Sequence, residues 1–280
     1  MKPLFTVIVL VYNNSQYLET CLDSVFRQNY ENMELLVVDD GSKTFDIPYF
    51  EAYISQHKRE NIRFASVYAN PENFGTVKSA NGALTKANGE YIKLIAADDA
   101  FYDENVLSNA QAGLEKCRGG LVISKVMKCD AELQPIGEYK TILQPLVNDI
   151  TPKQCFQKLS VHNGIIAGGA FFRKDFFEVY GLFDESYRLL EDWPTWLRVT
   201  RDGCKILYMP FFSVNYRADG GIGTSTNTVY MEDKNKVLRQ IIIPAKKELG
   251  LFTYCKARLS FALINAGFVR KLYGLVFRKN

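Results

Sequence analysis

Residues 6–42 read TVIVLVYNNSQYLETCLDSVFRQNYENMELLVVDDGS and carry the clearest pattern of secondary structure in the chain. The continuous apolar run at 6–12 is typical of a parallel strand that is covered on both faces. Apolar residues recur with helical spacing over 18–26, and a second apolar run at 35–38 ends at acidic residues. Strand, helix and strand in this order form a βαβ unit with a right-handed crossover. The stretch therefore predicts an α/β fold with a Rossmann-like, mostly parallel sheet flanked by helices.

The alternation of strands and helices continues along the chain. Further strands are expected at 62–68, 91–97, 121–126 and 205–211, and helices at 76–87, 103–116 and 193–201. Thr151, Pro152 and Gln154 have the spacing of a helix start with a capping box. Residues 127–150 fit neither pattern, and 217–228 form a loop rich in Gly, Ser, Thr and Asn. The pattern predicts one large α/β domain followed by a tail.

Composition and charge exclude several classes of protein. With 280 residues, 47% of them apolar and 23% charged, the chain is a folded protein and neither disordered nor a coiled coil. A net charge of +3 is too small for a nucleic-acid-binding protein, which needs a clustered basic face. Because the 6 cysteines stand singly and only 2 histidines are present, we expect neither a structural zinc site nor a disulfide framework. No apolar run reaches the roughly 18 residues of a membrane span, and we expect a cytoplasmic protein.

The C-terminal segment differs in charge from the rest of the chain. Residues 241–280 contain eight Lys or Arg against one acid, Glu248, and mix them with apolar residues. We expect residues 229–280 to form a helical, basic and amphipathic extension. Such a segment either lies on the anionic inner face of a membrane or packs its apolar side on the domain, and the sequence leaves both open.

Polar and acidic side chains follow three of the predicted strands. Ligands of open parallel sheets bind beside the carboxyl ends of the strands, so we expect these residues to be neighbours. They are Tyr12, Asn13, Asp39, Asp40, Asp98 and Asp99. Two adjacent carboxylates such as Asp98 and Asp99 repel each other unless a cation or a donor lies between them. They either hold Mg²⁺ or Mn²⁺ together with a ligand diphosphate, or open a loop and cap the helix that follows.

The DDGS sequence at 39–42 also has two interpretations. Asp-Gly is a frequent turn dipeptide, but a carboxylate at a strand end can accept a hydrogen bond from a nucleotide base or a ribose. The first strand is followed by YNNS at 12–15 and not by a glycine-rich turn. A nicotinamide or flavin site is therefore disfavoured.

Asp192 stands at the predicted N-terminus of the helix at 193–201. The partial positive charge of a helix N-terminus favours an ionised carboxylate, so Asp192 can act as a base, as a helix cap or as both. Glu191 beside it can orient an acceptor hydroxyl. No Ser/His or Cys/His pair presents itself as a nucleophile, and we expect His57 and His162 to be surface or structural residues.

Four motifs occur in an order that resembles a known family. They are the opening stretch at 6–42, NFGTVKSANGAL at 73–84, NGEYIKLIAADDAF at 88–101, and FDES at 183–186 followed by EDWPTWLR at 191–198. Together they resemble family 2 of the glycosyltransferases, with its A-type nucleotide-sugar fold, over residues 4–225. The resemblance implies a catalytic domain at 1–228, with a nucleotide-binding half at 1–99 and an acceptor half at 100–228, before the extension at 229–280.

The resemblance also implies roles for individual residues. Those implied to bind the nucleotide sugar are Tyr12, Asn13, Asp39, Asp40, Asn73, Gly75, Asn81, Asp98, Asp99 and Arg217. Those implied to contact the acceptor are Gly168, Gly169 and Trp193. Asp192 matches the family's general base, with Glu191 beside it. Asp98 matches the acid that binds Mn²⁺ or Mg²⁺.

Two positions depart from the family's pattern. The usual D-x-D-D sequence reads Ala96, Ala97, Asp98, Asp99 here, so the first carboxylate is missing. In the later Tyr-Arg-x-His element, Asp219 stands where the family has histidine. Because a carboxylate can ligate a hard cation, we expect Asp219 to offset the lost acid as a second metal ligand.

The implied activity is that of a metal-dependent, inverting glycosyltransferase. A sugar would move from a nucleotide diphosphate, a UDP-sugar before others, to a hydroxyl of a glycan or lipid-linked acceptor in cell-surface polysaccharide synthesis. A catalytically weak or inactive nucleotide-sugar-binding protein is the alternative, because Ala96 weakens the metal site. A nucleotidyltransferase is disfavoured because no basic, glycine-rich phosphate loop follows the first strand. The intact Glu191–Asp192 pair favours an enzyme, since a binding protein needs no base.

Overall fold

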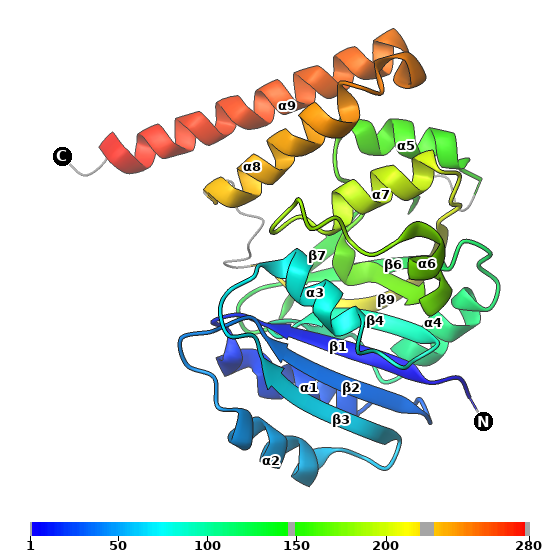
Figure 1. Ribbon diagram of the computed structural model, residues 1–280, viewed down its shortest axis with the longest axis vertical. Helices are drawn as coiled ribbons and strands as arrows, with labels where there is room; N and C mark the ends of the chain where they lie inside the picture. Colours follow the sequence, from blue (N-terminus) through cyan, green and yellow to red (C-terminus); the bar gives the residue numbers. More distant parts are fainter. Residues whose placement is uncertain (1, 145–148, 219–226, 278–280) are drawn as a thin grey trace.

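The computed structural model describes residues 2–144, 149–218 and 227–277, and its centre is a mixed sheet (Figure 1). The strand order is β3-β2-β1-β4-β8-β6-β9-β5, with β7 beside β6. The strands are β1 (Phe5–Val11), β2 (Met33–Asp39), β3 (Ile62–Ala69), β4 (Tyr91–Ala96), β5 (Ala100–Phe101), β6 (Leu121–Cys129), β7 (Pro135–Tyr139), β8 (Ala170–Arg173) and β9 (Leu207–Arg217). The helices are α1 (Leu18–Phe26), α2 (Ile47–His57), α3 (Thr76–Leu84), α4 (Val106–Leu114), α5 (Pro152–Val161), α6 (Lys174–Tyr180), α7 (Asp192–Arg201), α8 (Thr228–Val237) and α9 (Lys246–Phe277).

The N-terminal strands form the parallel half of the sheet that residues 6–42 predict. β1 pairs in parallel with β2 on one side and with β4 on the other. In this register Val11 lies opposite Asp39, and Leu10 lies opposite Ala96. The carboxyl ends of the three strands are therefore level, and the polar residues that follow them meet at one edge of the sheet. This confirms the predicted neighbourhood.

Helices cover both faces of the sheet. On one face α1, α2 and α4 bury an apolar cluster that includes Leu22, Phe50 and Leu107. On the other face α3, α5 and α7 enclose a second cluster with α9 (Figure 1). Each fully buried Leu or Phe side chain contributes roughly 1.5–3 kcal/mol of transfer free energy, so the two clusters carry most of the stability of the fold.

The second half of the sheet is less regular than the first. β8 runs antiparallel to β4 and β6, whereas β9 runs parallel to β6 and antiparallel to the two-residue β5. Residues 127–150, which fit neither pattern, complete β6 and contain the exposed β7. β9 begins and ends later than the predicted strand at 205–211, and its last residue, Arg217, reaches the turn after β4. The predicted capping box at Thr151 is present at the start of α5.

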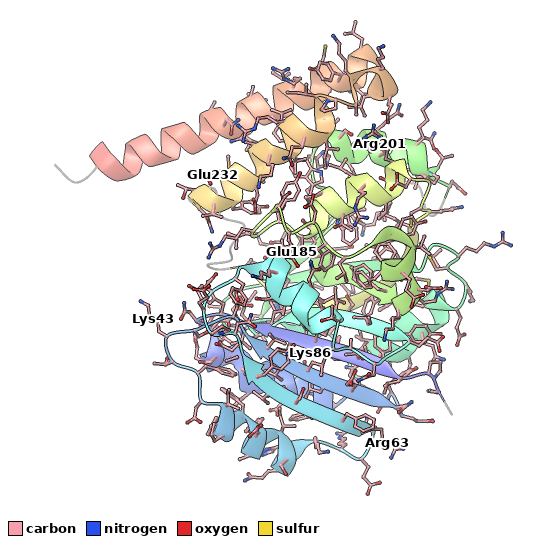
Figure 2. The ribbon with its side chains drawn as sticks, in the orientation of Figure 1. Lys43, Arg63, Lys86, Glu185, Arg201 and Glu232 are labelled. Atoms are coloured by element: carbon pink, nitrogen blue, oxygen red, sulfur yellow. The ribbon has the colours of Figure 1, made fainter. Side chains whose placement is uncertain are left out.

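The C-terminal extension is helical and packs on the domain with one side. Ala257 and Phe261 of α9 are buried, and the Phe261 ring stacks on Trp193 of α7 with centroids 5.3 Å apart. Arg201, labelled in Figure 2, donates from Nε to Glu248 Oε2 at 2.8 Å and links α7 to α9. The extension thus shares a core with α5 and α7, and a domain boundary after residue 228 stays a prediction. Within the described ranges, no helix is both long and apolar enough to cross a membrane.

Candidate functional site

A cavity of about 730 Å³ lies at the carboxyl ends of β1 and β4, beneath the starts of α7 and α8. The predicted site residues that line it are Tyr12, Asn13, Asp40, Asp98, Asp99, Gly168, Glu191, Asp192 and Trp193. Asp40, Asp98 and Asp192 come from three distant parts of the sequence. The fold brings their carboxylates to a single hollow, which any joint chemistry of these groups requires.

The other predicted site residues do not line this cavity. They are Asp39, Asn73, Gly75, Asn81, Gly169 and Arg217. Asp219, the predicted second metal ligand, lies outside the described residues. The ligand contacts of all these residues stay predictions.

Asp40 is buried and its carboxylate is already occupied by the protein. Its oxygens accept hydrogen bonds from Phe74 N and Gly75 N, both at 2.9 Å, and from Ser79 Oγ at 2.5 Å. Asn70 Nδ2 donates to the same group at 3.1 Å. Asp40 therefore holds the loop before α3 in place. Because its oxygens are engaged in this way, its clearest structural role is to shape the cavity wall.

Asn73, Gly75 and Asn81 connect the two halves of the chain. Arg188 Nη2 donates to Asn73 O at 3.0 Å, and Asn81 Nδ2 donates to Phe183 O at 2.9 Å. Gly75 has φ +87°, and a Cβ there would lie 2.6 Å from Arg188 O. Only glycine fits this close approach without strain. These residues of the NFGTVKSANGAL motif attach the segment that leads to Glu191 and Asp192.

The turn after β4 is fastened to the end of β9. Arg217 N donates to Asp99 Oδ1 at 2.9 Å, and Arg217 Nε donates to Asp98 O at 3.0 Å. The Arg217 guanidinium is buried and lies 4.1 Å from the centroid of the Tyr17 ring. Burial, and next the charge of Asp98, raise the pKa of Asp99 well above its usual value. Asp98 is more exposed, and burial raises its pKa against the opposing effect of Arg217.

The oxygen ligands at this turn fit a cation that is bound partly by the protein and partly by a substrate phosphate. Asp98 lines the cavity with a partly exposed carboxylate, whereas the first acid of the usual motif is replaced by Ala96. Among the described residues, no three His, Cys, Asp or Glu side chains are grouped to hold a metal ion by themselves. Mg²⁺ and its analogues are often bound by one or two carboxylates plus substrate phosphates. Asp98 can serve such an ion only together with a diphosphate.

Asp192 begins α7, as the sequence predicts, and is held by two donors. Asn163 Nδ2 donates to Oδ2 at 2.8 Å, and Trp193 N donates to Oδ1 at 2.6 Å. Burial raises the pKa of Asp192, and these hydrogen bonds oppose the increase. Burial, and next the charge of Asp192, raise the pKa of Glu191 further. At neutral pH the pair therefore favours an ionised Asp192 beside a protonated Glu191, which separates a base from a hydrogen-bond donor.

Trp193 and Gly168 line the cavity, and Gly169 follows Gly168 in the chain. The Trp193 indole is 1% exposed, and its Nε1 donates to Leu159 O at 2.8 Å. A Cβ on Gly169 would lie 2.8 Å from Ser124 O, whereas one on Gly168 would meet nothing closer than 3.8 Å. A Cβ on Gly168 would therefore make only ordinary contacts with Ile166 and Tyr216, whereas one on Gly169 would be too close to the backbone.

Lys93 is a charged residue in the core behind this wall. Its ammonium is completely buried, donates to Gly168 O and to Ala170 O, and lies 4.5 Å from the Phe171 ring centroid. Burial lowers the pKa of Lys93 to about 7. The hydrogen bonds join β4 to the glycine segment, so Lys93 fixes where that segment meets the cavity. Its place within an apolar strand motif carried no signal of this role.

Several residues that line the cavity were missed by the sequence analysis. They are Tyr139, His162, Asn163, Tyr216, Tyr230, Lys234 and Ile264. His162, expected at the surface or in a structural role, is exposed and also borders the cavity. Tyr230, Lys234 and Ile264 belong to the extension, so that segment completes the site. The Tyr-Arg pair at 216–217 was the one sequence signal near this group.

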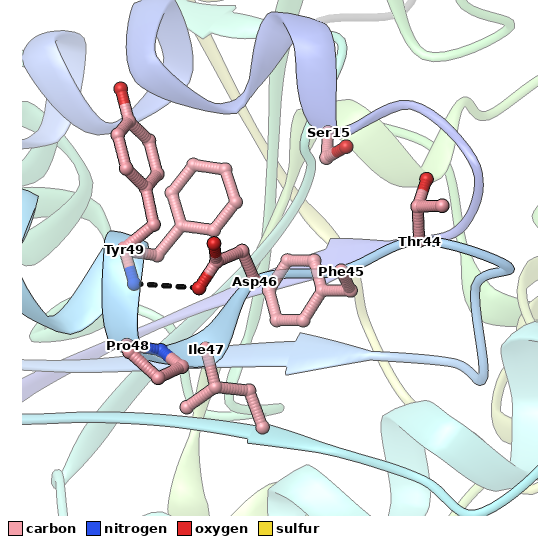
Figure 3. A pocket seen from close by; sticks show the side chains of 8 residues that line it. Ser15, Thr44, Phe45, Asp46, Ile47, Pro48 and Tyr49 are labelled. Carbon is pink, nitrogen blue, oxygen red and sulfur yellow. Dashed lines mark hydrogen bonds between the residues drawn. The ribbon is translucent and has the colours of Figure 1, made fainter.

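A second hollow, of about 640 Å³, lies at the surface beside α2 (Figure 3). Asp46 caps that helix by accepting from Tyr49 N at 2.9 Å, and the rings of Phe45 and Phe50 stack 5.2 Å apart. The residues that line it are Ser15 and residues 44–50, with Asp46 as their one acid. The paired acids lie in the larger cavity, which is the better candidate for a reaction.

Two bacterial relatives match most of this chain. An uncharacterized glycosyltransferase of Haemophilus influenzae is 28% identical over 279 residues, which is 97% of this chain and 80% of the relative. A PGL/p-HBAD biosynthesis glycosyltransferase of Mycobacterium tuberculosis is 25% identical and matches 89% of this chain and 87% of its own length. Four other bacterial glycosyltransferases match over less than half of their own length.

Solved structures share the fold. Staphylococcus aureus TarS, residues 1–349, superposes with a TM-score of 0.64 at 19% identity, covering 100% of this chain and 76% of that one. TarS has also been solved in complex with UDP-GlcNAc. A mannosyltransferase of Pyrobaculum calidifontis, in complex with GDP-Man and Mn²⁺, has a TM-score of 0.61 at 19% identity, covering 99% and 80% of the two chains.

The family model named Glycosyl transferase family 2 matches residues 6–181, which is more than half of the sequence. The matched segment contains β1, the turn after β4 and the loop at 163–169, and so supplies most of the cavity. This chain therefore belongs to family 2 of the glycosyltransferases.

Proposed function

We propose that this glycosyltransferase transfers a sugar from a nucleotide diphosphate to an acceptor hydroxyl with inversion at the anomeric carbon. The observation that carries the proposal is that Asp98 and Asp192 line one cavity, at the end of β4 and at the start of α7. A carboxylate that can hold a diphosphate-bound cation and a carboxylate that can act as a base are then available to the same substrates. This arrangement favours an enzyme over a protein that only binds nucleotide sugars.

Asp192 acts as the general base in the proposed reaction. It accepts the proton of the acceptor hydroxyl while the hydroxyl oxygen forms a bond to the anomeric carbon. The bond from that carbon to the diphosphate breaks in the same displacement, and the nucleoside diphosphate leaves with the electron pair. A single displacement from the opposite face inverts the configuration. Glu191, protonated beside Asp192, orients the acceptor by donating a hydrogen bond.

The diphosphate is proposed to lie near Asp98. A divalent cation, Mn²⁺ or Mg²⁺, supplies positive charge that stabilises the leaving group when it is bound there. The Mn²⁺ in the complex of the P. calidifontis mannosyltransferase supports this assignment. Arg217 holds the Asp98–Asp99 turn by its hydrogen bonds and adds a fixed positive charge behind it. Tyr12 and Asn13, at the end of β1, are proposed to contact the nucleoside.

UDP-sugars are proposed as the first donors to test, because TarS has been solved with UDP-GlcNAc. In a panel of UDP-, GDP- and other nucleotide sugars, tested with and without Mn²⁺, the true donor should raise the thermal unfolding midpoint of the protein. Consumption of a radiolabelled donor then separates an enzyme from a binding protein. If some donor binds but is neither transferred nor hydrolysed with any acceptor, the binding protein is the better description.

The acceptor is proposed to be a glycan or a lipid-linked sugar used in cell-surface polysaccharide synthesis. The M. tuberculosis relative, which is named for PGL/p-HBAD biosynthesis, supports a role in making glycoconjugates. We place the reaction in the cytoplasm, at the inner face of the membrane.

As the pH is lowered, the rate of transfer is expected to fall at a pH higher than the usual pKa of a carboxylate. The base must be ionised, and burial raises the pKa of Asp192, so the acid limb of kcat/KM should lie above the ordinary Asp value of about 4. Asn163→Ala removes a hydrogen bond that favours the ionised form, and should move this limb to still higher pH. The pH profile of kcat/KM measures both.

The control for this prediction is Asn29→Ala, which changes an exposed asparagine outside the cavity. An acid limb that does not move in Asn163→Ala would exclude the proposed coupling.

The raised pKa values of Glu191 and Asp192 also mean that the folded state holds these protons to higher pH than the unfolded chain does. The contribution of the pair to stability should therefore be present at low pH and be lost as the pH rises through the raised values.

The outer side of α9 is proposed to lie on an anionic membrane surface. Phe252, Leu259 and Leu263 are 74%, 61% and 65% exposed and share one helix face, opposite the buried Phe261. Lys256 and Arg258 lie beside them, and residues 241–280 contain eight basic residues against one acid. An apolar stripe with flanking cations favours the interface of a bilayer that contains anionic lipids.

Replacing Leu259 and Leu263 together by Glu should weaken binding to vesicles that contain anionic lipid by at least about tenfold. Burial of each Leu contributes about 1.5–3 kcal/mol, and the new charges repel the lipid. Co-sedimentation with vesicles measures the effect. Phe64→Glu is the matched control, because Phe64 on β3 is 63% exposed on another part of the surface. Equal vesicle binding by the wild type and the α9 variant would count against a membrane role.

A further inference from the structure

α8 is fixed in position over the Glu191–Asp192 pair. Asp233 is 3% exposed, and its Oδ2 accepts from Arg188 N at 2.9 Å and from Leu189 N at 2.7 Å. These two amides belong to the segment that leads directly into Glu191. Because the helix is attached there, the residues next to Asp233 are held against the cavity, and α8 is part of its wall.

Two side chains of α8 line the cavity from this position. Tyr230 and Lys234 lie one helical turn apart, and Lys234 Nζ is 4.6 Å from the centroid of the Tyr230 ring. Tyr230 is partly buried and lines the same cavity as Glu191 and Asp192. Burial, and next the charges of Asp192 and Glu191, raise the pKa of its hydroxyl. α8 therefore presents an aromatic ring and an ammonium group next to the proposed base.

Within 2–144, 149–218 and 227–277, the Lys234 ammonium has no counter-ion in contact. Among the residues that the structure describes, no side chain forms an ion pair or a hydrogen bond with it. Asp192 acts on Lys234 through its charge, but its two oxygens are held by Asn163 and Trp193. Burial also lowers the pKa of Lys234, which reports the cost of its partial desolvation. A partly desolvated cation that faces a cavity is stabilised when an anion enters.

We propose that Lys234 and Tyr230 recognise an acceptor that carries a phosphate or carboxylate group close to the hydroxyl that receives the sugar. The acceptor ring packs on Tyr230 while its anionic group pairs with Lys234. This inference rests on the proposed transfer reaction and names its acceptor class. An acceptor of this class would also explain why part of the cavity wall comes from the extension, which lies outside the family-matched segment at 6–181.

The donor diphosphate is a less suitable partner for Lys234. The proposed diphosphate site lies at the turn after β4, where Asp98 lines the cavity and Arg217 supplies a cation. Lys234 is instead coupled to Asp192, on the side where the acceptor hydroxyl must lie. The positive charge of Lys234 beside Asp192 also lowers the basicity of Asp192. An anionic acceptor group removes this disadvantage because it neutralises Lys234 when the acceptor binds.

The test uses the full chain with its nucleoside diphosphate bound and four small probes. These are sn-glycerol 3-phosphate and glucuronate, with glycerol and glucose as their neutral counterparts. Calorimetry or ligand-detected NMR gives the affinity of each probe for the wild type, Lys234→Met, Lys234→Arg and Lys247→Met. The last variant loses the same charge at an exposed position on α9 and is the matched control.

We expect each anionic probe to bind the wild type at least about tenfold more tightly than its neutral counterpart, as for a hydrogen bond to a charged group. Lys234→Met should remove this preference, whereas Lys234→Arg and Lys247→Met should keep it. Nucleoside diphosphate affinity should be the same in all four proteins. The two anionic probes show whether phosphate or carboxylate is preferred.

Three results would overturn the inference. The first is equal binding of anionic and neutral probes to the wild type, which needs no variant and so does not depend on the folding of one. The second is a preference that persists in Lys234→Met. The third is a loss of nucleoside diphosphate affinity in that variant, which would assign Lys234 to the donor. Failure of the transfer reaction itself is seen separately, as a nucleotide sugar that is not consumed.

Discussion

Asp192→Asn is expected to abolish sugar transfer while the variant still binds nucleotide. A positioned general base contributes about 10²–10⁴-fold to a rate, and an amide cannot take up the acceptor proton. The substitution keeps the size of the side chain, and an amide oxygen can still accept from Trp193 N, which caps the start of α7. Initial rates with a radiolabelled donor measure the loss, and calorimetry with the nucleoside diphosphate measures binding.

Glu191→Gln is the comparison for this variant. Since Glu191 is expected to be protonated at neutral pH, Gln should preserve its role as a donor and reduce the rate far less than Asp192→Asn does. Turnover close to that of the wild type in Asp192→Asn would remove Asp192 from the role of base. Loss of nucleotide affinity in the same variant would indicate that the carboxylate has a structural or donor-binding role.

Trp193→Ala is expected to lower the free energy of unfolding by about 3–5 kcal/mol, the range found when a buried Trp or Phe is truncated to Ala. The side chain is 1% exposed and stacks on Phe261 at a ring-centroid distance of 5.3 Å. Truncation leaves a cavity between α7 and α9 and removes the partner of Leu159 O. Urea denaturation, with the midpoint and slope compared between proteins, measures the change.

Trp193→Phe separates this packing role from contact with the acceptor. Phe keeps the ring against Phe261 and loses the Nε1 hydrogen bond, so we expect a much smaller loss of stability and an acceptor KM close to that of the wild type. If Trp193→Phe raises the acceptor KM strongly without loss of stability, Trp193 touches the acceptor as the family resemblance implies. A stable Trp193→Ala variant would contradict the packing role.

The coupling between α7, α8 and α9 connects these predictions. Asp192 begins α7, Trp193 packs on α9, and Asp233 of α8 binds the backbone that leads into the pair. The position of the proposed base therefore depends on the C-terminal extension as well as on the sheet. Damage to this contact should reduce transfer even where donor binding persists.

The sequence predicts the parallel half of the sheet well because the information there is local. β1, α1 and β2 each show the periodicity of their own structure within a few residues, and the βαβ rule then predicts parallel strands with a right-handed crossover. Level strand ends then place Asp40 and Asp98 at one edge without further information. Asp192 was predicted at a helix N-terminus from its own neighbours, and α7 begins at that residue.

The remainder of the site depends on contacts between segments far apart in the sequence. Asn163 reaches Asp192, and Lys234 faces it from α8, yet neither residue lies in a motif that specifies a partner. β5, β7 and β8 are too short or too exposed to show a clear period. The burial that raises the pKa values of Glu191 and Asp192 likewise arises only when α7 is covered.

The family, the α/β class and the three carboxylates that line one cavity could be predicted from the sequence, because strand polarity and helix starts are encoded in adjacent residues. Which of the predicted residues line the cavity, and which of them, such as Asp40 and Trp193, also hold its walls together, became visible only in the folded chain. The same holds for the completion of the site by α8 and α9. Side-chain burial and hydrogen-bond partners depend on packed neighbours that are distant in the sequence, and a local pattern does not contain this information.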